Sequence, residues 1–170
     1  EGYWLSRIIP VIKNISADEV SLTYQIEEGP KIKIRKIVTE GNKALSASKI
    51  KGVMETKEWW LFSFITSSGY FQKERMAMDV ERIRDLYFNN GYIKVVIGEP
   101  AVRLTEDKKG MTITIPVSEG DQYKVSSISL SGNKVFGDDA IRKRITMAPE
   151  KPFSKGTLRK DILSISELYS

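Results

Sequence analysis

The chain has 170 residues, of which 41% are hydrophobic and 29% charged, a composition typical of a folded globular protein rather than a disordered one. It contains neither cysteine nor histidine, which excludes a thiol nucleophile, a Cys/His metal site and an imidazole acid–base group. The formal net charge is +5, with acidic residues interspersed among the basic ones, which favours a mixed solvated surface over a nucleic-acid or lipid site.

The first 29 residues predict a strand–strand hairpin. Val20, Leu22, Tyr24 and Ile26 alternate with polar residues, as in a strand with one buried face. The opening Glu1–Tyr3 does not begin a signal peptide, and no apolar run approaches the roughly 18 residues that span a bilayer. We therefore expect a segment of a longer chain.

A further strand is predicted over residues 31–39. Its alternation slips between Ile34 and Ile37, and residues 123–130 slip at the corresponding place. Because a slip of one residue turns side chains to the opposite face, we expect a bulge or bend near Arg35–Lys36.

Two helices are predicted next. Ser46 follows the Gly41–Asn42 turn as the N-cap of a short helix, and a longer helix runs from about Gln72 to Asn89, with Gly91 suited to the left-handed position after its end. Its apolar stripe consists of Met76, Val80, Ile83 and Tyr87.

Two strands, Tyr92–Leu104 and Met111–Val117, close the unit around the polar turn 106–110. Pro116 cannot donate a ladder hydrogen bond, so it either faces an unpaired side or marks a local distortion.

The sequence repeats. Glu28–Gly29 recurs 91 residues later as Glu119–Gly120, and Gly41–Lys43 recurs at the same offset as Gly132–Lys134. The helical segments Phe71–Tyr87 and Phe153–Tyr169 match at an offset of 82, so the first copy carries an insertion of nine residues between 57 and 71. Offsets shared by separate motifs indicate tandem copies of one module.

Three motifs occur in a fixed order along the chain: Glu-Gly, then Gly-Asn, then helix–Asn-Gly-Tyr–hairpin. They are accompanied by the stretches Glu58–Trp60, Asn89–Tyr92, Leu104–Gly110 and Val117–Lys124. Together these features resemble the POTRA (polypeptide-transport-associated) family over nearly the whole chain. The resemblance is strongest to the third such module of the factor that folds β-barrels into the bacterial outer membrane. It implies an α+β fold in which each β-α-α-β-β module has a three-stranded sheet covered on one face by two helices. Residues 1–29 would end one module, 30–119 form a complete module, and 120–170 begin the next.

The resemblance further implies a periplasmic scaffold of a Gram-negative outer-membrane protein, without cofactor, metal or catalysis. Its partners would be unfolded outer-membrane β-barrel proteins, accessory lipoproteins and the protein's own C-terminal membrane barrel. A POTRA module of a two-partner secretion transporter or of a cell-division scaffold is the alternative. A nucleic-acid module is disfavoured because no Gly-x-x-Gly with basic flanks and no ribonucleoprotein-type aromatic pair is present.

An enzyme is also disfavoured. The carboxylate pairs Glu27–Glu28 and Glu106–Asp107 lie at turns rather than in an apolar cleft. Ser46–Lys49 matches a Ser-x-x-Lys spacing at a helix cap by chance.

Two segments are candidate binding sites. The resemblance favours strand addition at the edge formed by Tyr92, Ile93, Lys94, Val95, Val96 and Ile97, where Lys94 would guard against uncontrolled pairing. The apolar insertion holds Trp59, Trp60, Phe62 and Phe64, which form either a docking patch or, as we favour, a packing element.

The two ends of the chain suggest self-association. Residues 1–29 supply a hairpin, and residues 120–170 supply the strand and helices that such a hairpin would cover. Since each piece alone leaves apolar faces uncovered, we expect head-to-tail completion between neighbouring molecules.

Overall fold

The computed structural model describes residues 3, 5–61, 63 and 69–170. The chain divides into two compact units. One comprises Glu1–Val38, Glu55–Met76 and Pro100–Thr114, and the other comprises Thr39–Met54, Ala77–Glu99 and Ile115–Ser170. No helix among the described residues is both long and apolar enough to cross a bilayer.

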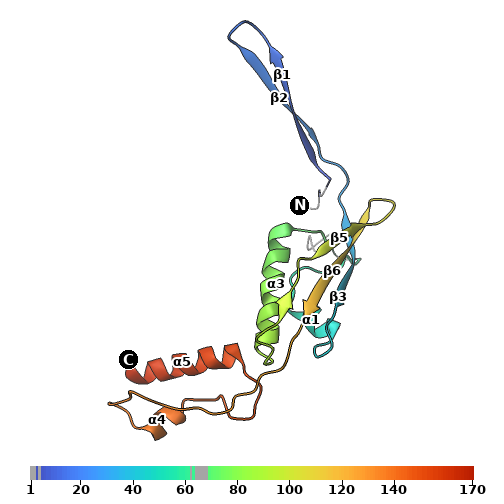
Figure 1. Ribbon diagram of the computed structural model, residues 1–170. Coiled ribbons are helices and arrows are strands. Elements are labelled where there is room, and N and C mark those ends of the chain that lie inside the picture. The colour runs from blue at the N-terminus through green and yellow to red at the C-terminus, as the bar shows by residue number, and fades with distance from the viewer. Residues whose placement is uncertain (1–2, 4, 62, 64–68) are drawn as a thin grey trace. The chain divides into compact units, whose positions relative to one another are not determined.

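The N-terminal hairpin is formed by strands β1 (Arg7–Asn14) and β2 (Val20–Glu27), which pair antiparallel, with Ile8 opposite Ile26 and Ile12 opposite Leu22 (Figure 1). Side chains directly opposite each other share a face. One face of the hairpin is therefore apolar, as the alternation predicted, yet its large side chains are 50–65% exposed. These exposed residues are Ile8, Ile12, Val20, Leu22, Tyr24 and Ile26.

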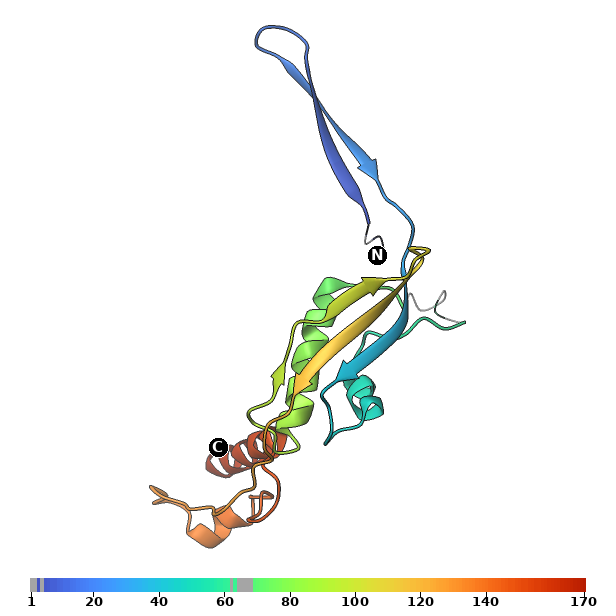
Figure 2. The ribbon, with the colours of Figure 1, turned by 45° about the vertical axis from the view of Figure 1, so that its right-hand side comes forward.

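A four-stranded sheet has β6 (Gly110–Ser118) at its centre (Figure 2). Strand β3 (Lys33–Glu40) pairs with one side of β6, while β4 (Val96–Ile97) and β5 (Ala101–Leu104) also pair with β6. The alternation predicted for β6 is confirmed, because Met111, Ile113, Ile115 and Val117 are all buried.

The prediction of one long strand over Tyr92–Leu104 is wrong, because the structure has two short strands there, β4 and β5. Residues 92–95 form a turn, and the register of the ladder shifts between Gly98, which donates to the Pro116 carbonyl at 2.8 Å, and Ala101, which lies opposite Thr114. Two residues, Glu99 and Pro100, therefore lie opposite Ile115, which makes a β-bulge. Neither Pro100 nor Pro116 has an N–H to give the ladder, so the interruption falls where pairing would be weakest.

The slip in the alternation of β3 also appears in its burial pattern, while the bulge or bend near Arg35–Lys36 stays a prediction. Ile34 and Ile37 are both buried while Arg35 and Lys36 between them are exposed, within one uninterrupted strand. In the second repeat, residues 123–130 form a single bridge, Lys124 to Pro152, instead of the predicted strand. A strand needs a neighbour to form a ladder, and no counterpart of β6 follows the second pair of helices within these 170 residues.

The helices follow the prediction closely. Helix α1 (Ala47–Val53) has Ser46 as its N-cap, whose hydroxyl accepts from the Lys49 N–H at 3.2 Å. Helix α3 (Lys73–Phe88) buries Met76, Ile83 and Tyr87. In the second repeat the helices are α4 (Asp138–Arg142) and α5 (Lys155–Tyr169).

Candidate functional site

The outer edge of β3 is closed by the segment that follows α1. Ile34 donates to the Gly69 carbonyl at 2.8 Å and accepts from the Trp59 N–H at 2.7 Å, and Ile37 donates to the Glu58 carboxylate at 2.9 Å. These bonds use main-chain groups that would otherwise be free to pair with another strand. The main-chain groups of Ile34 and the N–H of Ile37 are therefore not available to an added strand.

The apolar insertion contributes to that closure. Trp59 is half-buried, with the Lys33 ammonium 3.7 Å from its ring centroid, whereas Trp60 is 55% exposed and Leu61 is also exposed. Phe62 and Phe64, which the sequence placed in the same patch, lie outside the described residues. The segment thus combines a packed residue, Trp59, with an exposed one, Trp60.

The candidate edge strand is shorter than predicted. Only Val96 and Ile97 pair with β6, and the only strand that pairs with β4 among the described residues is β6. Because Gly98 donates to Pro116, the alternate residue Ile97 directs its own N–H and carbonyl away from β6. The side chain of Val96 is exposed and that of Ile97 is buried.

The other predicted edge residues, Tyr92, Ile93, Lys94 and Val95, lie in the turn before β4. Val95 is buried, and the Lys94 ammonium lies 5.3 Å from the ring centroid of Tyr123. The interaction with the Tyr123 hydroxyl raises the pKa of Lys94. Lys94 therefore contacts the start of the second repeat instead of lying along the β4 edge.

The Glu119 carboxylate connects three parts of the first repeat, and we call it together with its donors at Ala44, Leu45 and Tyr87 the clamp. It accepts from the Ala44 N–H at 2.9 Å, the Leu45 N–H at 3.4 Å and the Tyr87 hydroxyl at 2.8 Å. Burial alone would raise the pKa of Glu119, but these donors outweigh it and hold the pKa below its usual value. Burial and the neighbouring carboxylate raise the pKa of Tyr87. One carboxylate thus joins the end of β6 to the loop before α1 and to the last turn of α3.

The end of α3 also holds the second repeat. The main-chain N–H of Tyr123 donates to the Gly91 carbonyl at 2.8 Å. The side-chain oxygen of Asn89 accepts from the Gly156 N–H at 2.7 Å, and the Lys155 ammonium forms an ion pair with the Asp85 carboxylate at 2.7 Å. From the sequence, Asn89–Gly91 predicted only a helix end. The role of these residues in joining two repeats was missed, although the matched Asn-Gly-Tyr motif marked their position.

Replacing Asn89 with alanine is expected to loosen this junction, because the Gly156 N–H at the start of α5 would lose its acceptor. Loss of one such hydrogen bond costs about 1 kcal/mol. Amide hydrogen exchange at Gly156 should then become roughly fivefold to tenfold faster. Asn14→Ala, at the exposed end of β1, is the control and should leave that exchange unchanged. Equal exchange at Gly156 in the two variants would contradict a joining role for Asn89.

No group of three or more acidic side chains suited to hold a metal ion occurs in the part of the chain that the structure describes. The clamp carboxylate is occupied by main-chain and phenol donors. Among the groups described above, the main-chain N–H and carbonyl of Ile97 at the β4 edge point away from the sheet.

These features define the chain as an array of α+β modules joined end to end. The POTRA family model, described as surface antigen variable number repeat, matches residues 32–120 and 123–170. The chain belongs to the POTRA family.

Its relatives include the outer membrane protein assembly factor BamA of Neisseria meningitidis serogroup B, which is 31% identical over 88% of this chain and 19% of its own length. BamA of Nitratidesulfovibrio vulgaris is 27% identical over the whole chain and 22% of its own length. The crystal structure of Haemophilus influenzae BamA POTRA3-5 has the same fold, with a TM-score of 0.57 and 16% identity over 98% of this chain and 63% of that one. The chain spans about a fifth of these curated relatives.

Proposed function

We propose that the chain is the periplasmic POTRA segment of a Gram-negative outer-membrane β-barrel assembly factor, where it receives unfolded barrel proteins by strand addition at β4. The observation that carries the proposal is the contrast between the two edges. The β3 edge is occupied at Ile34 and Ile37 by Glu58, Trp59 and Gly69. Ile97 in β4, in contrast, has its main-chain N–H and carbonyl directed outward. Similarity to BamA proteins supplies the clients, which are outer-membrane proteins.

Strand addition suits such clients because main-chain hydrogen bonds make little demand on sequence. Barrel strands alternate apolar and polar residues, and the exposed Val96 offers apolar contact to one side-chain row of an added strand. Each main-chain hydrogen bond adds about 0.5–1.5 kcal/mol, so the two bonds at Ile97 give weak, reversible binding. The role is binding and scaffolding, not catalysis.

The exposed Trp60 and Leu61 are a separate surface that we assign to docking of an accessory lipoprotein of the assembly machine. Large apolar side chains in water favour a protein partner, and Trp is frequent among residues that dominate interface energies. The protein's own C-terminal membrane barrel would follow these modules in the chain.

Replacing Ile97 with proline is expected to reduce binding of an unfolded outer-membrane β-barrel protein about tenfold, because proline removes the outward N–H. Fluorescence anisotropy with a peptide of one barrel strand measures the affinity. The control is Ile97→Ala, which loses the same buried side chain and keeps the N–H. Equal affinities of the two variants, each with a folded circular dichroism spectrum, would count against strand addition at β4.

A further inference from the structure

The end of α3 contains Asn90–Gly91, the only Asn-Gly pair among the 170 residues. Such a pair is chemically unstable in a flexible chain. The glycine nitrogen can attack the side-chain carbonyl carbon of the asparagine, and no side chain on the glycine hinders that attack. Both residues nevertheless have a structural role where α3 meets the second repeat.

Gly91 is required by its backbone conformation and by a close neighbour in the second repeat. Its φ is 88°, in the left-handed region that favours glycine. A Cβ on Gly91 would lie 2.7 Å from the Tyr123 carbonyl oxygen and 3.3 Å from the Cβ of Pro152. The Gly91 carbonyl also accepts from the Tyr123 N–H at 2.8 Å. A larger residue at position 91 would therefore push the second repeat away from the end of α3.

Asn90 is required because its side chain completes the helix end. The main-chain N–H of Asn90 donates to the Tyr87 carbonyl at 2.9 Å, so the Leu86 carbonyl takes its donor from the Asn90 side-chain NH₂ at 2.7 Å. The side-chain oxygen of Asn90 accepts from the Lys49 ammonium at 3.1 Å. Its main-chain carbonyl accepts from the Gln122 side chain at 2.9 Å. One residue thus connects α3 to α1 and to the second repeat.

The same bonds keep the two reacting groups apart. The side chain of Asn90 points back along α3 to the Leu86 carbonyl, whereas the Gly91 nitrogen follows Asn90 in the chain. The Gly91 N–H is itself directed at the Phe88 carbonyl, at 3.4 Å. The side chain of Asn90 must leave Leu86 before it can reach the Gly91 nitrogen. Reaction in the folded chain therefore requires the end of α3 to open.

We propose that Asn90 is a protected deamidation site whose conversion releases the second repeat from the end of α3. The Gly91 nitrogen forms a bond to the side-chain carbon of Asn90, and the bond from that carbon to its NH₂ group breaks. The NH₂ group takes the proton of the Gly91 N–H and leaves as ammonia. Water then opens the five-membered ring at either carbonyl, which gives aspartate or isoaspartate without any oxidation or reduction.

Both products remove a group that the joint needs. A carboxylate cannot donate to the Leu86 carbonyl, and its charge lies at the helix end that already carries negative partial charge. The isoaspartate product also inserts one CH₂ group into the main chain between residues 90 and 91. Because the next carbonyl along that segment is that of Gly91, its hydrogen bond to the Tyr123 N–H would be lost.

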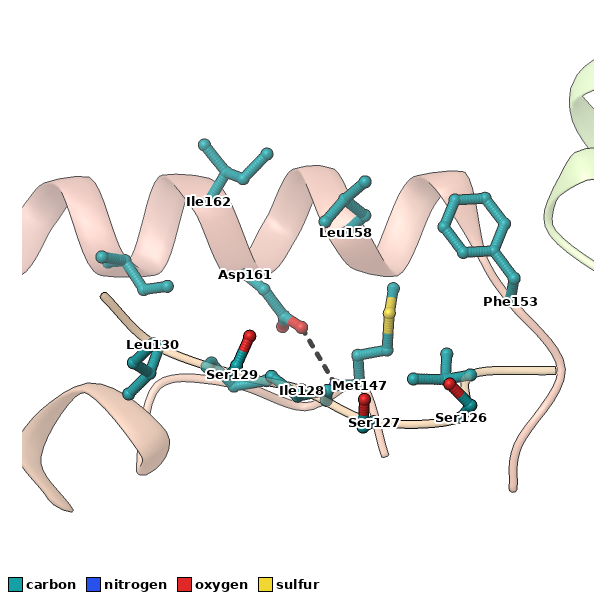
Figure 3. Close-up of a pocket in the computed structure, with 13 residues that line it drawn as sticks. Ser126, Ser127, Ile128, Ser129, Leu130, Met147, Phe153, Leu158, Asp161 and Ile162 are labelled. Atoms are coloured by element: carbon teal, nitrogen blue, oxygen red, sulfur yellow. Dashed lines mark hydrogen bonds between the residues drawn. The ribbon is translucent and has the colours of Figure 1, made fainter. Parts of the chain in front are cut away.

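The second repeat has internal support of its own, so the joint can open without unfolding it. The buried carboxylate of Asp161 in α5 accepts from the N–H groups of Thr146 and Met147 at 2.9 Å each (Figure 3). These bonds fix α5 to the loop before it and do not involve the end of α3. Hydrogen exchange at the Met147 N–H is therefore an internal standard for the release.

The first test compares the intact chain in buffer with the same chain unfolded in guanidinium chloride, at one mildly alkaline pH and one temperature. Peptide mass spectrometry locates the amide-to-acid conversion. Conversion of Asn90 should be at least about tenfold slower in the folded chain, which corresponds to an opening free energy of about 1.4 kcal/mol. Asn90→Gln is the matched variant, because it keeps an amide but needs a strained six-membered ring, so residue 90 should stay unconverted. Equal rates in the folded and unfolded chain, or no conversion of Asn90 in the unfolded chain, would overturn the proposal.

The second test measures the release on the deamidated chain, which ion exchange separates by its additional negative charge. Amide hydrogen exchange at Tyr123 should be about tenfold faster than in the unmodified chain, while exchange at Met147 should be unchanged. Asn14→Asp makes the same charge change at the exposed end of β1 and should leave exchange at Tyr123 unchanged. Unaltered exchange at Tyr123 in the deamidated chain would overturn the proposed release.

Discussion

Replacing Gly41 with alanine is expected to destabilise the complete module by about 3–4 kcal/mol. The residue has a φ of 86°, which costs a side-chain-bearing residue roughly 1–2 kcal/mol. An added Cβ would also lie 2.2 Å from the Val117 carbonyl oxygen, so β6 or the turn would have to move. Urea denaturation followed by circular dichroism measures the loss.

Two glycine variants separate these causes. Gly132 has the same backbone conformation without the close carbonyl, so Gly132→Ala should cost about 1 kcal/mol. Gly52 lies within α1 with open space around it, so Gly52→Ala should stabilise by about 0.5–1 kcal/mol. A Gly41→Ala cost no larger than that of Gly132→Ala would show that the contact with β6 is unimportant.

Replacing Glu119 with glutamine is expected to cost about 2–3 kcal/mol of unfolding free energy at neutral pH, because hydrogen bonds to a charged acceptor are lost and an amide NH₂ faces main-chain donors. The effect should depend on pH. The lowered pKa of Glu119 means that its stabilisation is present above the ordinary carboxyl value of 4.5 and is lost as pH falls through the lower native pKa. The difference between wild type and Glu119→Gln should therefore shrink in acid.

The matched control is Glu28→Gln. Glu28 precedes its glycine as Glu119 does but is exposed. Its replacement should change the unfolding free energy by less than about 0.5 kcal/mol. Equal losses for the two variants, or a Glu119→Gln difference that persists unchanged at low pH, would refute the clamp.

Much of the fold follows from the sequence because its signals are local or repeated. The helix stripe through Met76, Ile83 and Tyr87 places α3, the Ser46 cap places α1, and the offsets of 91 and 82 residues relate the two copies. The alternation along β2 and β6 identifies their apolar faces. Alternation does not say whether such a face is covered, which is why β2 and β6 look alike in sequence and differ in burial.

The parts that escaped prediction depend on contacts distant in sequence. Pro116 indicated a local distortion in the sequence, but the position of the bulge at Glu99–Pro100 depends on how β4 and β5 pair with β6. The bonds to the outer edge of β3 come from Trp59 and Gly69 in the following segment. Glu119 was recognised as a repeat marker, but its donors at residues 44, 45 and 87 meet only when the chain folds. The repeated Glu-Gly pair was the available signal, since a side chain needed at each module's end recurs with the module.

The bulge at Glu99–Pro100 has a consequence for the proposed strand addition at β4. A strand that extends along β4 would lose register after Gly98, so the ladder cannot lengthen past a few bonds. On the proposed function, this short ladder would keep the dwell time of a bound client strand short. The same interruption keeps the edge from nucleating extended aggregates, which a straight edge of the length predicted over Tyr92–Leu104 would invite.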